Sequence, residues 1–508
     1  MRNPVSAQAA DDSATPAPAG VKRTKPLPNS TYLTAASFAG KIFAFVALLD
    51  ILRTLPAPVF GNYTDVLTYV GLFGMFTDLG LNTVAVRDLA QDARSAVEYV
   101  SNILVLRLAL TIGLVVVIVV LAQFLVSPVD RLAVFVFSLS LIPIALGTTF
   151  GIAFQYQERL IFPAIINVVS SFLTALGYIV VLALGHHVLG LVAVFTLVNV
   201  LSTAASAWFV YARLLRWRLV VDVRTWPSLL ARSFPFFVLT MLNTIYLRAD
   251  MQILKLMMGC AHETVCRPLG EYGAAYRPLD AVGSIFYANI NMVMLPLLNR
   301  MAVESRAALA RVVRIGTTLV LAVGVPIALL TTFFAPQAMH LLAGKEGGYI
   351  VAAPALAVVI WAFPCSLVQC VWYNAVYALF KQHVVVLAFA VTAVFNIVFN
   401  ILLIPHFSYM ASAALTVASE LLNLLIVFIT LRRSLGPLGF GVATAKLGIV
   451  AAVASVVLWL LHPLGIVVGL PIGGLVILAG LKLTRLIGKA EREVLSSMPV
   501  VGRYAALF

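Results

Sequence analysis

Long apolar segments alternate with short polar ones along almost the whole chain. Each apolar segment has roughly the 20 residues that one α-helix needs to cross a bilayer. These segments lie at 33–55, 62–84, 100–126, 132–154, 161–184, 188–212, 234–258, 271–298, 312–334, 351–379, 384–404, 409–431, 440–461 and 464–486. The pattern predicts an all-α polytopic membrane protein with about 14 transmembrane helices.

Lysine and arginine are unevenly divided between the loops that join these segments. Most of them lie in the N-terminal tail, in 85–99, 155–160, 213–232, 299–314, 380–383 and 432–439, and near the C-terminus. The loops on the other side hold Arg53, Arg131, Arg267 and Lys345. Because cytoplasmic loops collect basic residues, this bias predicts a cytoplasmic (inner) membrane protein with both termini in the cytoplasm.

The composition leaves little protein outside the bilayer. Hydrophobic residues make up 62% of the 508 positions and charged residues only 11%, against about 25% charged in soluble domains. The basic loops explain the formal net charge of +14, so the charge does not indicate nucleic-acid binding. We find no Walker loop, dinucleotide fingerprint, hydrolase elbow or Cys–His metal spacing, which argues against an enzyme and against a bound cofactor or metal.

Two short motifs recur six predicted helices apart. Phe60-Gly61-Asn62-Tyr63 opens the second segment and Leu269-Gly270-Glu271-Tyr272 opens the eighth. Gln157-Glu158-Arg159 and Lys381-Gln382-His383 likewise follow the fourth and tenth segments. An even number of helices keeps the orientation, which indicates parallel repeats. We therefore predict a disordered cytoplasmic tail (1–30), an N-lobe (31–212), a basic linker (213–233), a C-lobe (234–433) with a central cavity between the pseudo-symmetric six-helix lobes, and two extra helices with the C-terminus (434–508).

Charged residues interrupt the seventh and eighth apolar segments. The seventh holds Arg248, Asp250 and Lys255. The eighth carries a polar stripe in steps of three and four residues, which is one face of a helix: Arg277, Asp280, Ser284, Tyr287 and Asn291. A charge at mid-bilayer costs roughly 3 kcal/mol or more, so these side chains should face protein or water. The pattern predicts a basic cavity suited to an anionic amphiphile.

Three groups of residues resemble motifs of polysaccharide flippases of the O-antigen type. The first group is Gly61-Asn62-Tyr63, Asp78-Leu79-Gly80-Leu81 and Arg87. The second is Arg248-Ala249-Asp250 with Leu269-Gly270-Glu271-Tyr272-Gly273-Ala274-Ala275-Tyr276-Arg277. The third is Asn396, Asn400, Ile404-Pro405, Ala413-Ala414, Thr416 and Glu420. One departure is His406-Phe407-Ser408-Tyr409, where the family has a glycine-rich loop.

This resemblance covers roughly residues 35–435 and points to the multidrug/oligosaccharidyl-lipid/polysaccharide exporter superfamily. It implies that a polyprenyl-diphosphate-linked oligosaccharide moves from the inner to the outer leaflet by alternating access. The implied partners are this lipid, the membrane and the polysaccharide polymerase machinery. The alternatives are a peptidoglycan-precursor flippase or a cation-coupled drug antiporter of the same superfamily, and, from another class, a membrane glycosyltransferase or ligase.

Five basic residues are candidates for binding a lipid diphosphate, because arginine and lysine can replace its lost hydration. They are Arg277, Arg248, Lys255, Lys41 and Arg53. The competing interpretation is a set of ion pairs that fix helix packing: Arg277 with Asp280, Arg53 with Asp50, and Arg248 with Asp250. We expect Arg107 and Lys446 to extend to the cytoplasmic surface.

Without an ATP site, transport against a gradient would use H⁺ or Na⁺, which intramembrane carboxylates usually carry. The candidates are Asp250, Asp280, Glu420 and Asp78. A polar patch near Glu420 could hold a cation or could form interhelical hydrogen bonds: Asn396, Asn400, Thr416 and Asn423.

The remaining candidates are amides and aromatic residues that suit sugar rings or ordinary helix packing. They are Gln369, Tyr373, Asn374, Tyr377, Tyr287 and Asn291. Cys260 and Cys266 lie in one predicted outer loop, where they could form a disulfide or remain free thiols.

Overall fold

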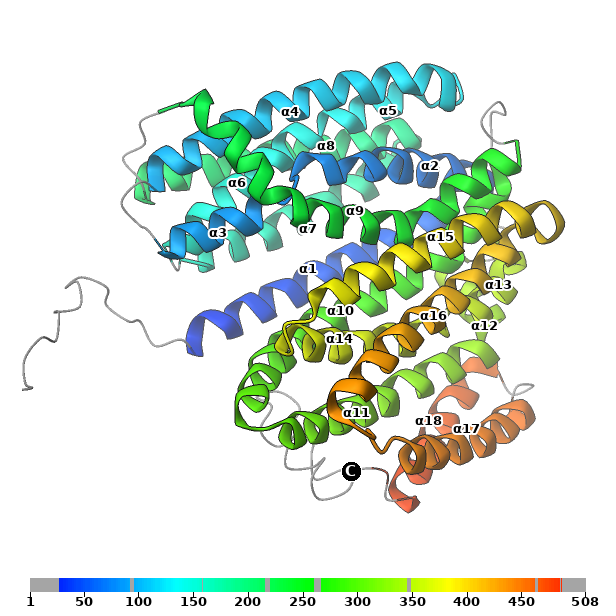
Figure 1. Ribbon diagram of the computed structural model, residues 1–508. Coiled ribbons are helices and arrows are strands. Elements are labelled where there is room, and N and C mark those ends of the chain that lie inside the picture. The colour runs from blue at the N-terminus through cyan, green and yellow to red at the C-terminus, as the bar shows by residue number, and fades with distance from the viewer. Residues whose placement is uncertain are drawn as a thin grey trace, which may run out of the picture.

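The computed structural model describes residues 27–91, 96–157, 159–214, 220–259, 266–344, 349–461, 465–484 and 486. All regular elements in these ranges are helices (Figure 1). Thirteen helical segments are long and apolar enough to cross a membrane by length and composition. The first predicted span, α1 (Leu27–Thr54), is not among them, although its 28 residues are long enough at about 1.5 Å each. The predicted all-α polytopic fold is confirmed.

The helices of the first half follow the predicted spans. They are α2 (Ala57–Gly74), η1 (Met75–Thr77), α3 (Leu81–Gln91), α4 (Ala96–Leu125), α5 (Arg131–Leu139), α6 (Leu141–Tyr156), α7 (Ile161–Ala183), α8 (Val188–Phe209) and η2 (Val210–Leu214). The second half contains η3 (Val223–Thr225), α9 (Trp226–Met257), α10 (Arg267–Glu304), α11 (Arg306–Phe333), α12 (Ala335–Ala343), η4 (Tyr349–Ala352), α13 (Ala353–Val359), α14 (Ala362–Ala378), α15 (Gln382–Phe407), α16 (Tyr409–Leu435), α17 (Gly441–Leu461) and α18 (Gly465–Leu483). The sequence pattern did not predict the short helix α12.

The Asp-Leu-Gly-Leu motif breaks the second span between η1 and α3. Leu79 and Gly80 have positive φ angles of 46° and 76°, which end the helix. A Cβ atom on Gly80 would lie 2.6 Å from the carbonyl oxygen of Ser233 in α9. Asp78 accepts a hydrogen bond from the backbone N–H of Asn82 at 3.2 Å, so it caps the first turn of α3. The motif therefore redirects the chain and lets α9 approach.

A second positive φ angle stands where the family resemblance expects glycine. Ser408, between α15 and α16, has a φ of 51°. The chain turns there without a glycine, because Ser408 itself adopts the left-handed conformation that usually favours glycine.

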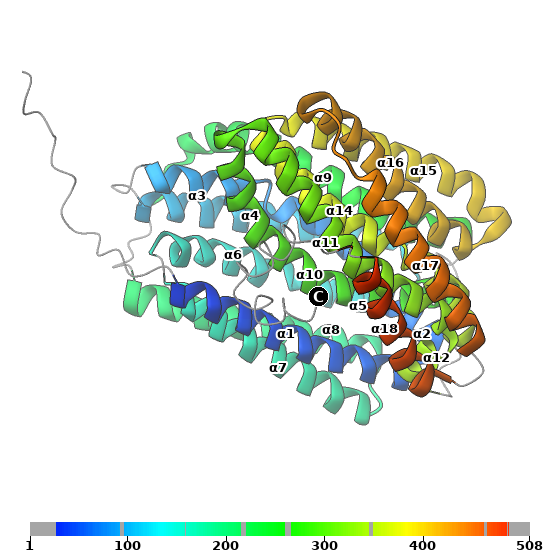
Figure 2. The ribbon, with the colours of Figure 1, turned by 90° about the horizontal axis from the view of Figure 1, so that it is seen from below.

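The helices gather into two groups with α1 and α9 between them (Figure 1), and the view from below shows α1 running beside α7 (Figure 2). One group contains α2 to α8 and the other α10 to α16; α1 packs along α7, and α9 along α15. Buried side chains of Ala322, Leu447, Val450 and Ile477 join α11 to the two additional helices α17 and α18. The predicted domain boundaries stay predictions, but α9 begins at Trp226, inside the segment 213–233 that was predicted as linker.

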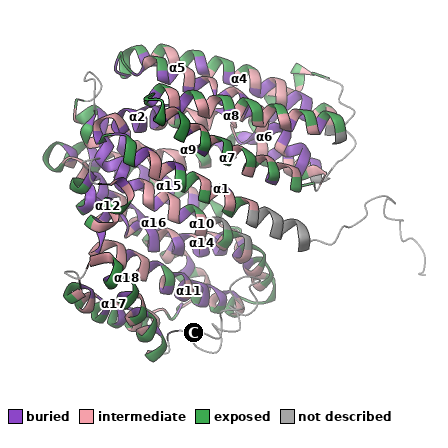
Figure 3. Cartoon of the chain, turned by 180° about the vertical axis from the view of Figure 1, so that it is seen from behind, coloured by how far each residue is buried: buried purple, intermediate pink, exposed green. Residues whose placement is uncertain are grey.

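The two recurring motifs cross each other where α2 meets α10. A Cβ atom on Gly61 would lie 2.0 Å from the carbonyl oxygen of Cys266, and one on Gly270 would lie 1.9 Å from that of Ala57. Only glycine allows two helix backbones this close. We call this the outer end, following the orientation predicted from the loop charges. Buried residues concentrate near it, around α2 and α12 (Figure 3).

The burial of α2 and α10 decreases away from the outer end. In α2 the stretch from Phe60 to Val66 is buried, whereas Gly71 is exposed. In α10 the stretch from Leu269 to Tyr276 is buried, whereas Ser284 is exposed. The two halves are therefore packed together at the outer end and more open toward the predicted cytoplasmic end.

Candidate functional site

Arg277 lies in the outer half of the predicted eighth span, 271–298, between the two halves of the protein. It is about 15 Å along α10 from the helix start at Arg267. Its charge acts on Tyr63 of α2 and Tyr178 of α7. Within the ranges that the structure describes, the ion pairs do not include Arg277. A partly exposed guanidinium without a carboxylate partner is available to an anionic ligand.

Asp280, which the packing interpretation paired with Arg277, forms its ion pair with Arg248 instead. Nη2 of Arg248 lies 3.4 Å from Oδ2 of Asp280, and both side chains are about one-third exposed, at 35% and 38%. Asp250, the other predicted partner of Arg248, instead accepts a hydrogen bond from the hydroxyl of Tyr272 at 2.5 Å. Asp280 therefore neutralises Arg248 rather than Arg277.

The two basic residues of α1 contact backbone oxygens of the opposite half. Nζ of Lys41 donates to the carbonyl of Ser284, on the polar stripe of α10. Nη2 of Arg53 donates to the carbonyl of Leu341 in α12 at 2.9 Å. Lys41 thus lies beside the stripe that carries Arg277, whereas Arg53 ties α1 to the outer end of the second half.

Lys255 is buried at the outer end of α9 and is ion-paired. Only 2% of its side chain is exposed, and its Nζ lies 2.8 Å from Oδ2 of Asp65 in α2 and 5.7 Å from the centre of the Tyr69 ring. In this conformation Lys255 is not accessible to a substrate. Sequence reasoning missed Asp65; the signal was its position as a carboxylate within an apolar span, which requires a partner.

Replacing Lys255 with methionine should destabilise the protein. Removing one partner of a buried ion pair costs about 3–5 kcal/mol, because the other charge stays buried without compensation. We expect a large loss of thermal stability in detergent for Lys255→Met and a much smaller one for Lys255→Arg. Adding Asp65→Leu to Lys255→Met should restore part of the loss. Equal stability of Lys255→Met and the wild type would show that the pair contributes nothing.

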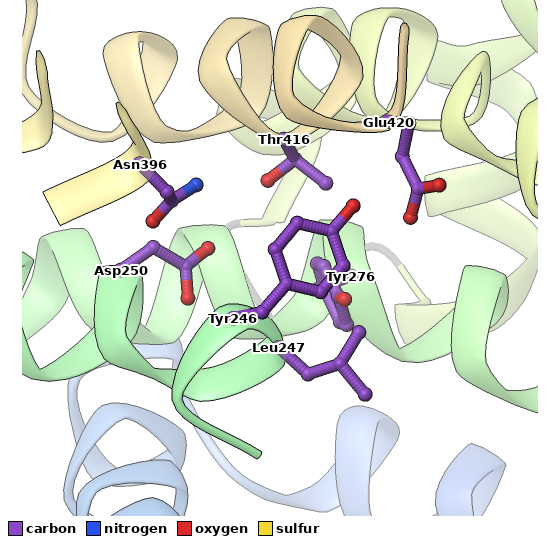
Figure 4. Close-up of a pocket in the computed structure, with 7 residues that line it drawn as sticks. All are labelled: Tyr246, Leu247, Asp250, Tyr276, Asn396, Thr416 and Glu420. Atoms are coloured by element: carbon purple, nitrogen blue, oxygen red, sulfur yellow. The ribbon is translucent and has the colours of Figure 1, made fainter. Parts of the chain in front are cut away.

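Two predicted carboxylates face one small cavity in the second half (Figure 4). Asp250 comes from α9 and Glu420 from α16, and the rings of Tyr246 and Tyr276 lie between them. The full lining is Tyr246, Leu247, Asp250, Tyr276, Asn396, Thr416 and Glu420. The cavity has room for about one water molecule, which is also the scale of a single small cation.

Neither carboxylate forms an ion pair with a described lysine or arginine. Asp250 is 3% and Glu420 5% exposed. The hydroxyl of Tyr272 links Asp250 to Thr416, whose Oγ1 lies 3.1 Å away, and Gln369 donates to Glu420. A buried carboxylate without a cationic partner is stable either as the neutral acid or beside a bound cation. These hydrogen bonds alone do not neutralise two carboxylates.

The surrounding amides bond mainly to hydroxyl groups on the neighbouring helices. Asn400 donates to Oδ1 of Asn396 at 3.0 Å and accepts from the hydroxyl of Ser412 at 2.9 Å. Asn423 accepts from Tyr373 at 2.6 Å. The structure therefore brings Asn396 and Thr416 to the cavity, and places Asn400 and Asn423 in interhelical hydrogen bonds outside its lining.

The family model described as polysaccharide biosynthesis protein matches residues 27–302, more than half of the chain. The chain belongs to this family. A second model, MatE, matches residues 300–402. None of the curated proteins matches the chain.

Solved structures with the same fold include flippases and drug transporters. The lipid II flippase MurJ in an inward closed conformation has a TM-score of 0.71 at 12% identity, over 89% of this chain and 98% of that chain. An inward-facing multidrug resistance MATE transporter has a TM-score of 0.63 at 13% identity, over 80% and 98%. A transporter from Pyrococcus furiosus with a binding pocket of reverse polarity has a TM-score of 0.55 at 13% identity, over 81% and 96%. The chain is therefore a multi-pass membrane protein of the polysaccharide biosynthesis family, with the fold of these flippase and drug-transporter structures.

All six residues predicted to contact sugar lie in the second half, on α10 and α14. Gln369 and Tyr373 bond to Glu420 and Asn423, and Asn374 donates to Asn291 at 2.7 Å. Tyr287 and Tyr377 are partly buried, and Asn291 is exposed. Sugar contact stays a prediction for all six positions.

Asp78 and Arg107 have different surroundings from those expected. Asp78 is ion-paired with Arg107, which is fully buried and also donates to Thr148 at 2.8 Å and Thr149 at 2.9 Å. The expectation that Arg107 extends to the surface was therefore wrong.

Cys266 is disulfide-bonded; Cys260, its predicted partner, lies outside the described residues.

Proposed function

We propose that this transporter moves a polyprenyl-diphosphate-linked oligosaccharide from the inner to the outer leaflet of the cytoplasmic membrane by alternating access. The observation that carries the proposal is Arg277, a cation inside a predicted span between the two halves that has no carboxylate partner among the described residues. The family description, polysaccharide biosynthesis, supports this substrate class.

A diphosphate substrate would account for an arginine inside a predicted span that pairs with no described carboxylate. A diphosphate loses its hydration when it enters the hydrocarbon region, and a planar guanidinium can replace it with two parallel hydrogen bonds. Lys41 lies beside the same stripe of α10, at Ser284, and Arg248 is one-third exposed nearby. We infer that the diphosphate binds Arg277 first and that Lys41 and Arg248 increase the local positive potential.

Asp250 and Glu420 are the proposed coupling residues. Their cavity holds two carboxylates without a cationic partner, so a proton or Na⁺ bound there would neutralise charge that is otherwise costly to bury. Release of that ion would change the packing of α9 against α16, and α9 passes between the two halves. Coupling would thus act through α9.

Replacing Asp250 with asparagine should remove the ion dependence of transport. The amide keeps the shape of the side chain but cannot bind or release a proton and holds Na⁺ far more weakly. We expect gradient-driven transport to fall by at least about tenfold (roughly 1.4 kcal/mol) and to become insensitive to pH or Na⁺. Glu304→Gln, an exposed carboxylate at the end of α10, serves as the control. Unaltered ion dependence in Asp250→Asn would leave this cavity a structural hydrogen-bond network.

A cation-coupled drug antiporter is the second candidate. The MatE match over residues 300–402 favours it, as do the two buried carboxylates. Against it stands the positive charge of Arg277, which would repel a cationic drug that passes between the halves. A peptidoglycan-precursor flippase would carry the same lipid diphosphate with a different head group. The proposed flippase function also implies an interaction with the polysaccharide polymerase machinery.

A translocation assay separates these functions. Purified protein is reconstituted into liposomes that hold a fluorescent polyprenyl-diphosphate oligosaccharide, and exposure of the sugar in the opposite leaflet is followed with a membrane-impermeant glycosidase. Liposomes without protein give the background. We expect translocation above background. Background rates, together with uptake of a lipophilic drug cation by the same liposomes, would contradict the proposal.

A further inference from the structure

A buried group of charges at the outer end has no part in the proposed substrate or coupling sites. Asp65 of α2 and Lys255 of α9 form its ion pair, at 2.8 Å. Asp130, in the turn between α4 and α5, adds a second carboxylate whose charge interacts with both. The exposed fractions are 4% for Asp65, 2% for Lys255 and 5% for Asp130. These three residues are called the outer triad below.

The outer triad bridges the two halves of the protein. Asp65 and Asp130 belong to the first half, whereas Lys255 belongs to α9, which packs on both α2 and α15 and is joined to α10 through Asp250 and Tyr272. The crossing of Gly61 and Gly270 lies one turn of α2 from Asp65. The triad is therefore enclosed only while the outer ends of the halves stay together, and it would meet water when they separate.

The charges of the outer triad do not balance. Two carboxylates and one ammonium group leave one net negative charge when all three are ionised. Gln252 donates a hydrogen bond to the Asp65 carboxylate. Asn62 donates to Asp130, but a neutral amide does not cancel a charge. Burial of the extra charge is costly, and uptake of one proton removes that cost.

We propose that the protein binds one proton at Asp130 when its outer end closes, and releases it when that end opens. The site would make closure of the outer end dependent on the pH outside, whichever lipid the protein carries. It is separate from Asp250 and Glu420 and would act on the outer gate rather than on the second half.

The surroundings of Asp130 support this assignment. Burial, and then the charge of Asp65, raise the pKa of Asp130 to about 6, against the opposing effects of Lys255 and Asn62. Arg131 does not neutralise it, because its guanidinium donates to the carbonyls of Gln123 and Val126. His187, just before α8, is exposed, and on α2, Tyr69 donates to the carbonyl of Ile118.

The sign of the pH dependence follows from this difference. In the open state Asp130 meets water and returns to its ordinary pKa of about 4. The closed state then holds more protons between pH 4 and 6, so closure is favoured at low pH and weakens as the pH rises. We expect the ratio of open to closed protein to rise on the order of tenfold between pH 4.5 and 7.

Cysteine labelling from outside measures the open fraction. Thr64→Cys, at a position 0% exposed between α2 and α10, reports opening in a full-length background with Cys365→Ser and Cys370→Ser. Leu184→Cys, at a position 69% exposed in the turn after α7, corrects for the effect of pH on thiol reactivity. Right-side-out vesicles are treated with a membrane-impermeant maleimide at each pH, and the ratio of the two labelling rates is recorded.

Two variants of the outer triad test whether Asp130 binds the proton. Asp130→Asn mimics the protonated acid, so its labelling ratio should stay low and nearly independent of pH. Asp65→Asn balances Lys255 against an ionised Asp130, so it should also lose the pH dependence. Glu304→Gln should keep the wild-type profile. A wild-type ratio that does not change with pH, or a wild-type profile in either triad variant, would overturn the proposal.

Discussion

Replacing Arg277 with alanine is expected to abolish translocation of a diphosphate lipid while the protein still inserts and folds. The substitution removes two charge-assisted hydrogen bonds to the diphosphate at the depth where its hydration is lost. With hydrogen bonds to charged groups worth about 1.5–3 kcal/mol each, we expect at least a 100-fold loss in the liposome assay. Because Arg277 has no carboxylate partner among the described residues, its removal leaves no charge uncompensated.

Two further variants show whether the loss comes from the guanidinium at this position. Arg277→Lys keeps the charge but not the planar fork, so it should retain a small fraction of the activity. Arg300→Ala removes an exposed arginine nearer the inner end of α10 and should transport normally. Translocation by Arg277→Ala at the wild-type rate would remove the basis of the proposed function.

Replacing Gly61 with alanine is expected to hold the outer end open. The new Cβ would lie 2.0 Å from the carbonyl oxygen of Cys266, and no rotamer change can relieve an overlap with backbone. Forcing volume into a packed interface costs about 1–3 kcal/mol, enough to shift the open-to-closed ratio by roughly tenfold or more. We expect outside labelling of Thr64→Cys to rise by that factor and translocation to slow, because the transporter then rarely faces inward.

Gly71→Ala provides a control on the same helix. A Cβ at Gly71 meets nothing within 4 Å, so this variant should label and transport like the wild type. Gly270→Ala tests the reciprocal contact, because its Cβ would lie 1.9 Å from the carbonyl oxygen of Ala57. Wild-type labelling in Gly61→Ala and Gly270→Ala would mean that the glycine crossing does not close the outer end.

The length and spacing of apolar segments were enough to predict the membrane fold. A bilayer forces each span to be a helix of about 20 residues, so helix positions follow from hydropathy alone. Hydropathy did not predict the breaks inside the spans. Leu79 and Gly80 interrupt the second span through their backbone conformation, which leaves hydropathy unchanged. The start of α9 at Trp226 was missed for the opposite reason, since this turn is helical without being apolar.

The partners of the charged residues could be predicted only in part. Sequence places Arg277 and Asp280 one turn apart on α10, yet Asp280 pairs with Arg248 of α9. Lys255 pairs with Asp65, far away in the sequence. Arg107 is buried beside Asp78 instead of reaching the surface. Helix periodicity shows which residues share a face. The choice between partners on different helices depends on how the helices cross, and a single sequence does not give the crossing geometry.

Ligand-dependent thermal stability of the purified protein in detergent tests most directly whether the substrate is a diphosphate lipid. The protein is titrated with a polyprenyl-diphosphate sugar and, separately, with a lipophilic drug cation. A ligand that binds only the folded protein adds about 2.7 kcal/mol at 100 times its dissociation constant. We predict stabilisation by the diphosphate lipid that Arg277→Ala loses and Arg300→Ala keeps. Stabilisation by the drug cation alone would contradict the proposed flippase and favour the antiporter.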